Sequence, residues 1–388
     1  MKKLNFHSAK LKALCCAAML FVGVFESCSQ PPVPTNDTFK RKIKLALLLD
    51  TSNSMDGLIN QAKSQLWKVV NSLSAATCNG TKPDIEIAIY EYGNTRLSAQ
   101  SDYIRKVSAL TSDLDKISND LFSLTTSGGD EYCGHVIQTA LNELAWNADG
   151  NDLQIIFIAG NEPFTQGTVS YTTACANAKA KGIIVNTIFC GDFNEGINTD
   201  WKKGADIAGG SYMSINQNSQ TTYIATPYDD KISALNDSLN TTYIGYGQHG
   251  AAKKQMQVLQ DANANSYGLA NKAERAVSKS KSVYKNSSWD LVDAVKYDSV
   301  HVESIKDEEL STEMKQMTVA QRKVYVEEKS KKRSQINSEI EKLNTQRTQY
   351  ISAEQAKTAT AAESLDNSLL KAVKEQAVSK KFVFEESK

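Results

Sequence analysis

The stretch LALLLDTSNS at residues 45–54 decides the fold. An unbroken run of apolar residues predicts a central parallel strand, because helices cover both faces of such a strand and its residues do not alternate with polar ones. The run passes directly into Asp50, Ser52 and Ser54, which are one carboxylate and two hydroxyls. Ligands bind to open α/β sheets where the carboxyl ends of the strands emerge. We therefore expect these three side chains to line a binding edge.

The three side chains are also the right type for a metal ion. Carboxylate and hydroxyl oxygens are hard ligands of the kind that Mg²⁺ prefers, and three protein oxygens leave octahedral positions open for water or a partner. The alternative is that Asp50, Ser52 and Ser54 only cap the following helix. Capping needs one such residue and not three, so we expect a Mg²⁺ or Mn²⁺ site.

The rest of the first 246 residues predicts strands that alternate with helices. Such alternation calls for a doubly wound, mostly parallel sheet, an α/β fold of the Rossmann type. The expected strands are 43–49, 85–90, 103–107, 153–158, 183–189 and 211–215, and the expected helices are 56–73, 113–123, 134–146, 169–181, 200–208 and 229–239.

The motif and this order of elements resemble the von Willebrand factor A (VWA) domain, with its metal-ion-dependent adhesion site, over residues 42–246. Asp50, Ser52 and Ser54 match the motif of that site directly. The family's next ligand is usually a Thr after a Gly pair. Here that loop reads TTSGGD at residues 125–130, so the resemblance favours Asp130 over Thr126.

The last acidic ligand of the family usually lies in a Thr-Asp-Gly turn, and this chain departs from that pattern. Residues 158–163 read IAGNEP, in which Asn161 offers a carbonyl oxygen and Glu162 a carboxylate. Asp50 and Asp130 together would neutralise a divalent cation, so we expect a tightly held metal that attracts an acidic partner less strongly.

Two motifs suggest other functions, and both are rejected. An apolar strand that ends in Asp also opens phosphoryl-transfer enzymes, but these need a second Asp where this chain has Ser52, and proton transfer needs a titratable group. The sequence GYGQHG at residues 245–250 matches a dinucleotide fingerprint, but it does not follow the first strand of a βαβ unit. The four histidines lack metal-like spacing. We therefore expect no enzyme, no catalytic residues and no bound organic cofactor.

The charge balance excludes one class of partner. Lys plus Arg and Asp plus Glu number 44 each, and basic residues do not cluster with aromatic ones. We therefore expect that the protein does not bind nucleic acid.

The amino terminus predicts export. Lysines precede an apolar stretch at residues 13–25 that is too short to span a bilayer, as in a signal peptide. Cys28 resembles the acceptor of bacterial lipoproteins, so residues 1–28 are interpreted as a signal peptide with Cys28 lipidated, and residues 29–41 as a Pro-rich tether. Ordinary cleavage and secretion is the alternative. The expected location is the cell envelope, as a membrane lipoprotein, or the periplasm or medium.

Four cysteines remain beyond Cys28, and their even number suits an oxidising compartment. Cys78, Cys133, Cys175 and Cys190 allow two disulfides in three connectivities.

Residues 247–388 differ in character, because they are rich in Lys, Glu, Gln, Ser and Ala and predict helices. Ile336, Ile340, Leu343 and Tyr350 follow the spacing of a short coiled-coil seam. The sequence thus supports two functions: a protein that binds a partner protein through its metal, or an envelope scaffold that oligomerises through this tail with a purely structural metal.

Overall fold

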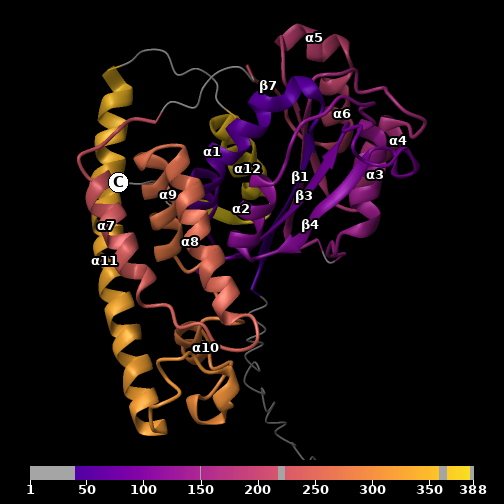
Figure 1. Cartoon of the computed structure of the whole chain (residues 1–388). Coiled ribbons are helices and arrows are strands. Elements are labelled where there is room, and N and C mark those ends of the chain that lie inside the picture. The colour runs from indigo at the N-terminus through magenta and orange to yellow at the C-terminus, as the bar shows by residue number, and fades with distance from the viewer. Residues whose placement is uncertain (1–39, 149, 217–222, 358–364, 385–388) are drawn as a thin grey trace, which may run out of the picture. The chain divides into compact units, whose positions relative to one another are not determined.

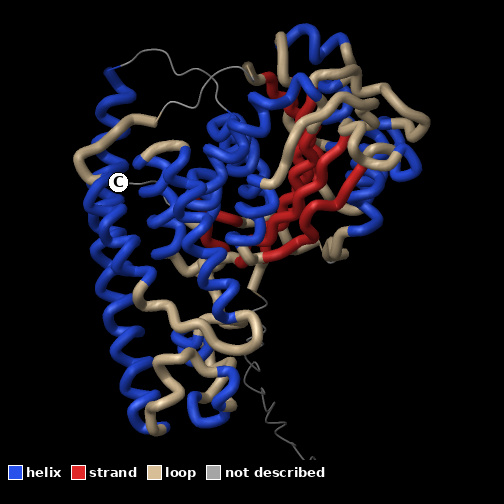
Figure 2. Tube along the Cα trace, viewed as in Figure 1, coloured by secondary structure: helices blue, strands red, loops and turns tan. Residues whose placement is uncertain are grey.

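The computed structural model describes residues 40–148, 150–216, 223–357 and 365–384 of the 388. The proposed signal peptide, Cys28 and nearly all of the tether lie outside the described residues. Figures 1 and 2 show a twisted sheet flanked by helices. Its strand order is β4-β3-β1-β5-β6-β7, and only β4 is antiparallel to its neighbour. The strands are β1 (Lys42–Asp50), β3 (Asp84–Tyr92), β4 (Ile104–Thr111), β5 (Leu153–Gly160), β6 (Ile184–Phe189) and β7 (Tyr212–Ser214).

Strand β1 occupies the middle of the sheet and is covered on both faces. Leu45 and Leu49 belong to one hydrophobic cluster, whereas Ala46 and Leu48 belong to another on the opposite face. This double burial is the physical reason for the unbroken apolar run. The predicted fold class, a mostly parallel doubly wound sheet followed by a helical region, is confirmed.

Helices form a layer on each face of the sheet, as Figure 1 shows. On one face lie α3 (Cys133–Glu143), α4 (Tyr171–Ala180) and α6 (Trp201–Ala208). On the other lie α1 (Asp56–Leu73) and α2 (Leu114–Phe122), joined by α12 (Leu365–Ser379) from the far end of the chain. A short helix that the sequence did not predict, α5 (Phe193–Asn198), follows β6.

The helical region packs onto α1 and α2 and shares their core. Its helices after the sheet are α7 (Asp229–Asn240), α8 (Gly250–Ser266), α9 (Leu269–Ser280), α10 (Leu291–Lys296) and α11 (Val319–Lys357). Arg275 of α9 is fully buried between Asp115 of α2 and Asp261 of α8, and its guanidinium stacks 4.3 Å from the Trp67 ring centroid. Residues 40–388 accordingly form one compact unit. The predicted domain boundary at residue 246 crosses this shared core.

The C-terminal segment completes the layer over β1 and β6. Gln376 of α12 exchanges amide hydrogen bonds of 3.1 and 2.6 Å with the buried Asn186 of β6. After α12, strand β8 (Phe382–Phe384) pairs antiparallel with β2 (Ala76–Cys78), which follows α1. A face of the N-terminal fold is therefore closed by residues that lie about 300 positions later in the sequence.

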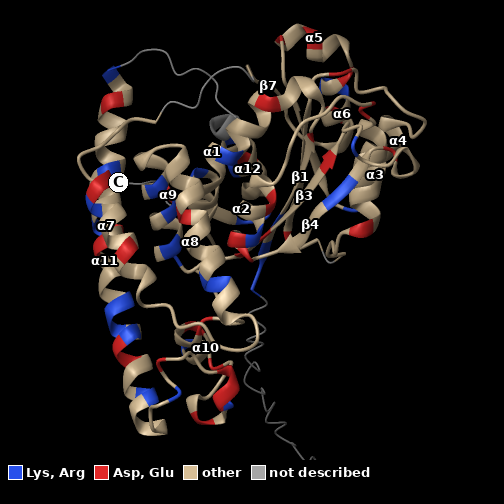
Figure 3. Ribbon diagram, in the orientation of Figure 1, with Lys and Arg blue, Asp and Glu red and all other residues tan. Residues whose placement is uncertain are grey.

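Three of the four residues of the predicted seam are used inside the chain, whereas the fourth, Tyr350, is exposed. Ile336, Ile340 and Leu343 of α11 are buried in the same cluster as α1 and β1. Arg347 of the same helix is buried and pairs with Asp229 and Glu274. Charges of both signs alternate along α11, as Figure 3 shows. Within the described ranges, no helix combines the length and apolarity that a membrane crossing requires.

Candidate metal centre

Three loops meet beyond the carboxyl ends of β1, β3 and β5. The first loop carries the Asp50 motif, and it is fixed from both sides: Thr51 N donates to Tyr92 O at 2.9 Å, and Ser127 N donates to Thr51 O at 3.0 Å. The second bond joins the motif to the loop at residues 125–130, so the topology brings two distant segments together. This is the edge where an open α/β sheet binds ligands.

Side chains of the motif converge as the sequence predicts. Ser52 N donates to Asp50 Oδ1 at 2.7 Å, which orients the carboxylate. The Ser52 and Ser54 hydroxyl oxygens lie 3.2 Å apart, and Ser54 Oγ donates to Asn161 Oδ1 at 3.4 Å. Asp50, Ser52, Ser54 and Asn161 are therefore gathered at one place. Asp50 and Ser52 are buried, whereas Ser54 is exposed.

A second carboxyl group, that of Glu131, shares the buried site with Asp50. Both carboxyl groups reach the same space beside Gly93, where a Cβ would lie 2.9 Å from Asp50 Oδ1 and 2.7 Å from Glu131 Cγ. Burial raises the pKa of Asp50 to about 6, although Glu131 and Ser52 act in the opposite direction. Burial together with the charge of Asp50 raises the pKa of Glu131 to about 9. Asp50 Oδ2 and Glu131 Oε2 receive no hydrogen bond from any donor among the described residues.

Glycines make room for this close approach. Gly93 has φ +76°, and a Cβ there would lie 2.7 Å from Glu131 Cγ and 2.9 Å from Asp50 Oδ1. At Gly129 a Cβ would lie 2.6 Å from Gly93 O, so the second glycine of the Gly pair allows its loop to pack against the end of β3. Only glycine tolerates both approaches.

The remaining predicted ligands lie around the rim. The Asp130 carboxylate is exposed and accepts a hydrogen bond from Tyr132 Oη at 3.1 Å. Thr126 Oγ1 donates to Asp56 at the start of α1. Glu162 is exposed and adds to the negative potential at Asp50. The structure therefore places Glu131, and not its neighbour Asp130, against Asp50.

Sequence reasoning missed Glu131, although one signal for it exists. The family pattern directs attention to the residue directly after the Gly pair, and Glu131 lies one position later. Glu131 is followed by TyrCysGly at the start of an apolar helix, so an acidic residue there is a candidate for a buried position at the helix entrance. Its N–H donates to Gln166 Oε1 at 3.1 Å, which turns this residue inward.

The residues present fit a divalent cation. Two adjacent buried carboxylates are costly unless a proton or a cation lies between them, and each here has an oxygen without a donor. Hydroxyls complete a set of hard oxygen ligands of the kind Mg²⁺ and Mn²⁺ take. The part of the chain described holds no group of three or more His, Cys, Asp or Glu arranged for a metal. The proposed set contains only two carboxylates, and its other two ligands are hydroxyls.

The four cysteines are buried and unpaired, so the two expected disulfides are absent between the described residues. Cys133 Sγ lies 3.8 Å from Tyr92 Oη, and Tyr92 Oη donates to Ala159 O at 3.0 Å. Burial raises the pKa of Cys133 and Cys190 above the ordinary value, with the charges of Asp50 and Glu131 acting in the same direction. These thiols are packing residues beneath the site.

Comparison with solved structures finds similar chains of low identity. The SpRpn10 VWA domain is 16% identical with a TM-score of 0.35, and the match covers 46% of this chain and 90% of that one. BatB, a conserved hypothetical protein from Bacteroides thetaiotaomicron, is 15% identical with a TM-score of 0.35, covering 45% and 90%. Proximal thread matrix protein 1 from the mussel byssus, with a zinc-occupied MIDAS motif, is 14% identical with a TM-score of 0.35, covering 45% and 41%. This chain thus spans less than half of the mussel chain.

A comparison with curated proteins finds no match. The family comparison gives the decisive result, because residues 44–212 match the von Willebrand factor type A domain. The matched range begins in β1 and ends at the first residue of β7, so it includes residues from all six strands of the sheet and all three loops of the candidate site. This chain therefore contains a von Willebrand factor type A domain.

Proposed function

We propose that this protein binds a partner protein through a divalent metal ion, Mg²⁺ or Mn²⁺, held by Asp50, Ser52, Ser54 and Glu131. Asp130, Thr126 and Asn161 surround this set on the rim. The single observation that carries the proposal is the buried pair Asp50 and Glu131, in which each carboxyl group has an oxygen without a hydrogen-bond donor. A proton or a cation must stabilise such a pair, and the two serine hydroxyls favour a cation.

A divalent ion bound there supplies positive charge and an open coordination position for an oxygen of the partner. The chain's own residues prepare this site. Ser52 N fixes the orientation of Asp50, and the bond from Ser54 to Asn161 holds the Ser54 hydroxyl at the exposed rim. Asp50 and Glu131 together offset the ion's charge, which favours neutral oxygen donors of the partner over carboxylates. The weaker attraction of acidic partner groups that was expected from Asp130 is therefore expected from Glu131.

The alternative function, a scaffold that oligomerises through its tail, loses the feature that suggested it. Ile336, Ile340 and Leu343 pack inside the chain, so of the four residues of the predicted seam only Tyr350 stays exposed for contact with another copy. Export and lipid attachment at Cys28 rest on the sequence alone and form part of the proposal. The same is true of the proposal that the protein is not an enzyme.

The experiment is thermal unfolding of the protein in EDTA and then at rising Mg²⁺ or Mn²⁺. An ion that binds only the folded state raises the melting temperature. At an ion concentration of 100 times the dissociation constant, the free energy of unfolding increases by about 2.7 kcal/mol. Asp50→Ala should abolish the response, and Asp206→Ala, which changes an exposed carboxylate of α6, should leave it unchanged. The same melting temperature with and without metal in the unaltered protein would reject the site.

Partner binding is tested separately. Ser54→Ala should prevent the metal-dependent retention of a partner on the immobilised protein, because Ser54 is the exposed hydroxyl of the set. Release of the partner by EDTA, and no retention by Ser54→Ala, would support the proposal. Equal retention by both proteins in EDTA would contradict it.

A further inference from the structure

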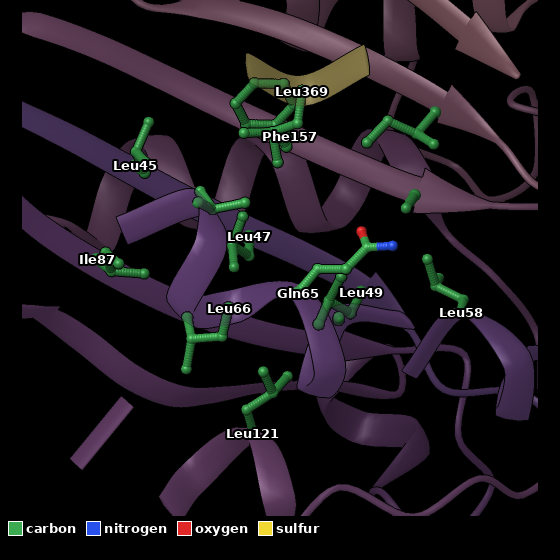
Figure 4. A pocket seen from close by; sticks show the side chains of 14 residues that line it. Leu45, Leu47, Leu49, Leu58, Gln65, Leu66, Ile87, Leu121, Phe157 and Leu369 are labelled. Atoms are coloured by element: carbon green, nitrogen blue, oxygen red, sulfur yellow. The ribbon is translucent and has the colours of Figure 1, made fainter. Parts of the chain in front are cut away.

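The layer of helices over β1 leaves a cavity of about 50 Å³ between the sheet and α1, which Figure 4 shows from close by. Its floor is formed by β1, β3, β5 and β6, and its sides by α1 and α2. Leu369 of α12 contributes the roof. Of the 14 lining residues, Gln65 alone is polar. The cavity lies between the sheet and the helices that cover it, and none of the proposed metal ligands lines it, so it is a separate feature.

Apolar side chains that face each other across this cavity stay partly accessible. Leu47 lies at the centre of β1, hydrogen-bonded between β3 and β5, yet it is less buried than Leu45 or Leu48. Opposite it, Ala62 and Val69 of α1 are also only partly buried. Protein interiors are close-packed, and apolar surface at the middle of a core is normally covered. A site of this composition stays dry and binds apolar molecules instead of water.

The shape of the cavity indicates what fits. Leu45, Leu47 and Leu49 all line it, and their Cα atoms span about 13 Å along the strand. The lining therefore runs along β1 from Leu45 to Leu49, so an extended molecule can contact the whole row of leucines. With an apolar lining and no charged residue in it, the site suits an extended, uncharged apolar chain.

We propose that this cavity is a binding site for an unbranched alkyl chain, with α12 as its roof. The roof is anchored by the paired amides of Gln376 and Asn186, so an occupant would be enclosed between the C-terminal helix and the sheet. Such a chain occurs free in fatty acids and as the acyl part of lipids. Both sources share the chemistry that the cavity recognises.

The test is the melting temperature of the protein in EDTA, with and without n-hexane dissolved in the buffer. Hexane should raise it saturably, by about 2 to 4 °C. Ala62→Leu, which fills the cavity from α1, should lose this rise while remaining folded. If Ala62→Leu does not fold, Val69→Leu replaces it. Absence of a rise in the unaltered protein, or a full rise in the filled variant, overturns the proposal.

A matched pair of truncations separates cavity binding from general destabilisation. Leu66→Ala enlarges the cavity, so it should lower the melting temperature and increase the response to hexane. Leu141→Ala removes the same atoms from a buried residue on the other face of the sheet and should leave the response at its original size. Equal responses of the two variants would contradict the proposal.

Two further melting-temperature measurements distinguish the two sources of the alkyl chain. Octanoate that raises the melting temperature of the unaltered protein but not of Ala62→Leu identifies a free fatty acid as the ligand class. If phosphatidylcholine vesicles raise the melting temperature of the unaltered protein but not of Ala62→Leu, and octanoate has no effect, the ligand class is the acyl chain of a lipid. If hexane binds and neither source does, the assignment to a biological alkyl chain is overturned.

Discussion

The carboxyl groups of Asp50 and Glu131 share one buried site beside Gly93, where a Cβ would lie 2.9 Å from Asp50 Oδ1 and 2.7 Å from Glu131 Cγ. Asp50 ends the central strand, and Glu131 lies 81 positions later at the entrance to α3. With no ion between them, they share the site best when a proton is present. With a divalent cation, both are stabilised as carboxylates. Proton and metal therefore compete for the same pair.

This competition predicts how stability changes with pH. Burial raises the pKa of Asp50 from 3.8 to about 6 and that of Glu131 from 4.5 to about 9. In that window the folded protein holds more protons than the unfolded chain, so stability in EDTA should fall as pH rises from about 4 to 9. Metal should stabilise increasingly over the same range. The check is the unfolding free energy at several pH values, with EDTA and with Mg²⁺.

The variant Glu131→Gln separates these two effects. Its side chain is of similar size but cannot ionise, so in EDTA at pH 8 it avoids the free-energy cost of protonating Glu131 in the folded state. It should therefore be more stable than the unaltered protein, by about 1–3 kcal/mol. Its Mg²⁺ response should be weaker, because one carboxylate ligand is lost. Asp130→Asn is the matched control and should change neither quantity, since the Asp130 carboxylate is exposed. A larger loss of Mg²⁺ response in Asp130→Asn than in Glu131→Gln would reassign the second carboxylate.

The space that Gly93 provides predicts a second effect. Gly93→Ala should abolish the metal response, because the added Cβ meets both Glu131 and Asp50. Gly80 is a matched control: its φ is +74°, close to the +76° of Gly93, but a Cβ there meets nothing within 4 Å. Gly80→Ala should cost only the strain of a left-handed residue, about 1 to 2 kcal/mol, and retain the metal response. Similar metal responses in the two variants would show that the glycine does not shape the site.

The part of this site that the sequence predicts is the part whose residues lie close together in the sequence. Asp50, Ser52 and Ser54 follow one apolar strand within five residues, so their convergence is a local consequence of strand and loop. The contact of Glu131 with Asp50 depends on the packing of the Gly pair against Gly93, which joins three separate loops. The sequence around Glu131 marks only a position at the entrance of an apolar helix and does not encode that packing.

The same distinction explains the fold. The alternation of strands and helices is visible because each element carries its own periodicity, and the predicted elements from 43 to 239 are found within a few residues of their bounds. The role of α12 is different. Its buried residues, among them Ala372 and Val373, show only that it packs against something. Which face it covers is decided by contacts with α1 and β6, about 190 residues or more away in the sequence.

The buried Arg275 predicts that the VWA domain and the helical region unfold together. Arg275 joins Asp115 of α2 to Asp261 of α8, and all three are buried. Breaking a buried ion pair leaves an uncompensated charge, so Arg275→Ala should lower the free energy of unfolding by about 3 to 5 kcal/mol. Lys202→Ala, which removes an exposed ion pair of α6 with Asp206, should cost less than about 1 kcal/mol. Urea unfolding followed by circular dichroism and by tryptophan fluorescence should give coincident single transitions. Two separated transitions would contradict a shared core.

The C-terminal strand predicts a cost for changes at the far end of the chain. Phe382 of β8 is 2% exposed and lies in the cluster with α1 and β1, whereas the next residue, Val383, is 62% exposed. Phe382→Ala should therefore lower the free energy of unfolding by about 3 to 5 kcal/mol. Val383→Ala should stay within about 0.5 kcal/mol of the unaltered protein. Both values come from urea unfolding in EDTA, where metal binding makes no contribution. If the two variants were equally stable, β8 would not belong to the core, and the closing of the sheet face by the C-terminal segment would have to be abandoned.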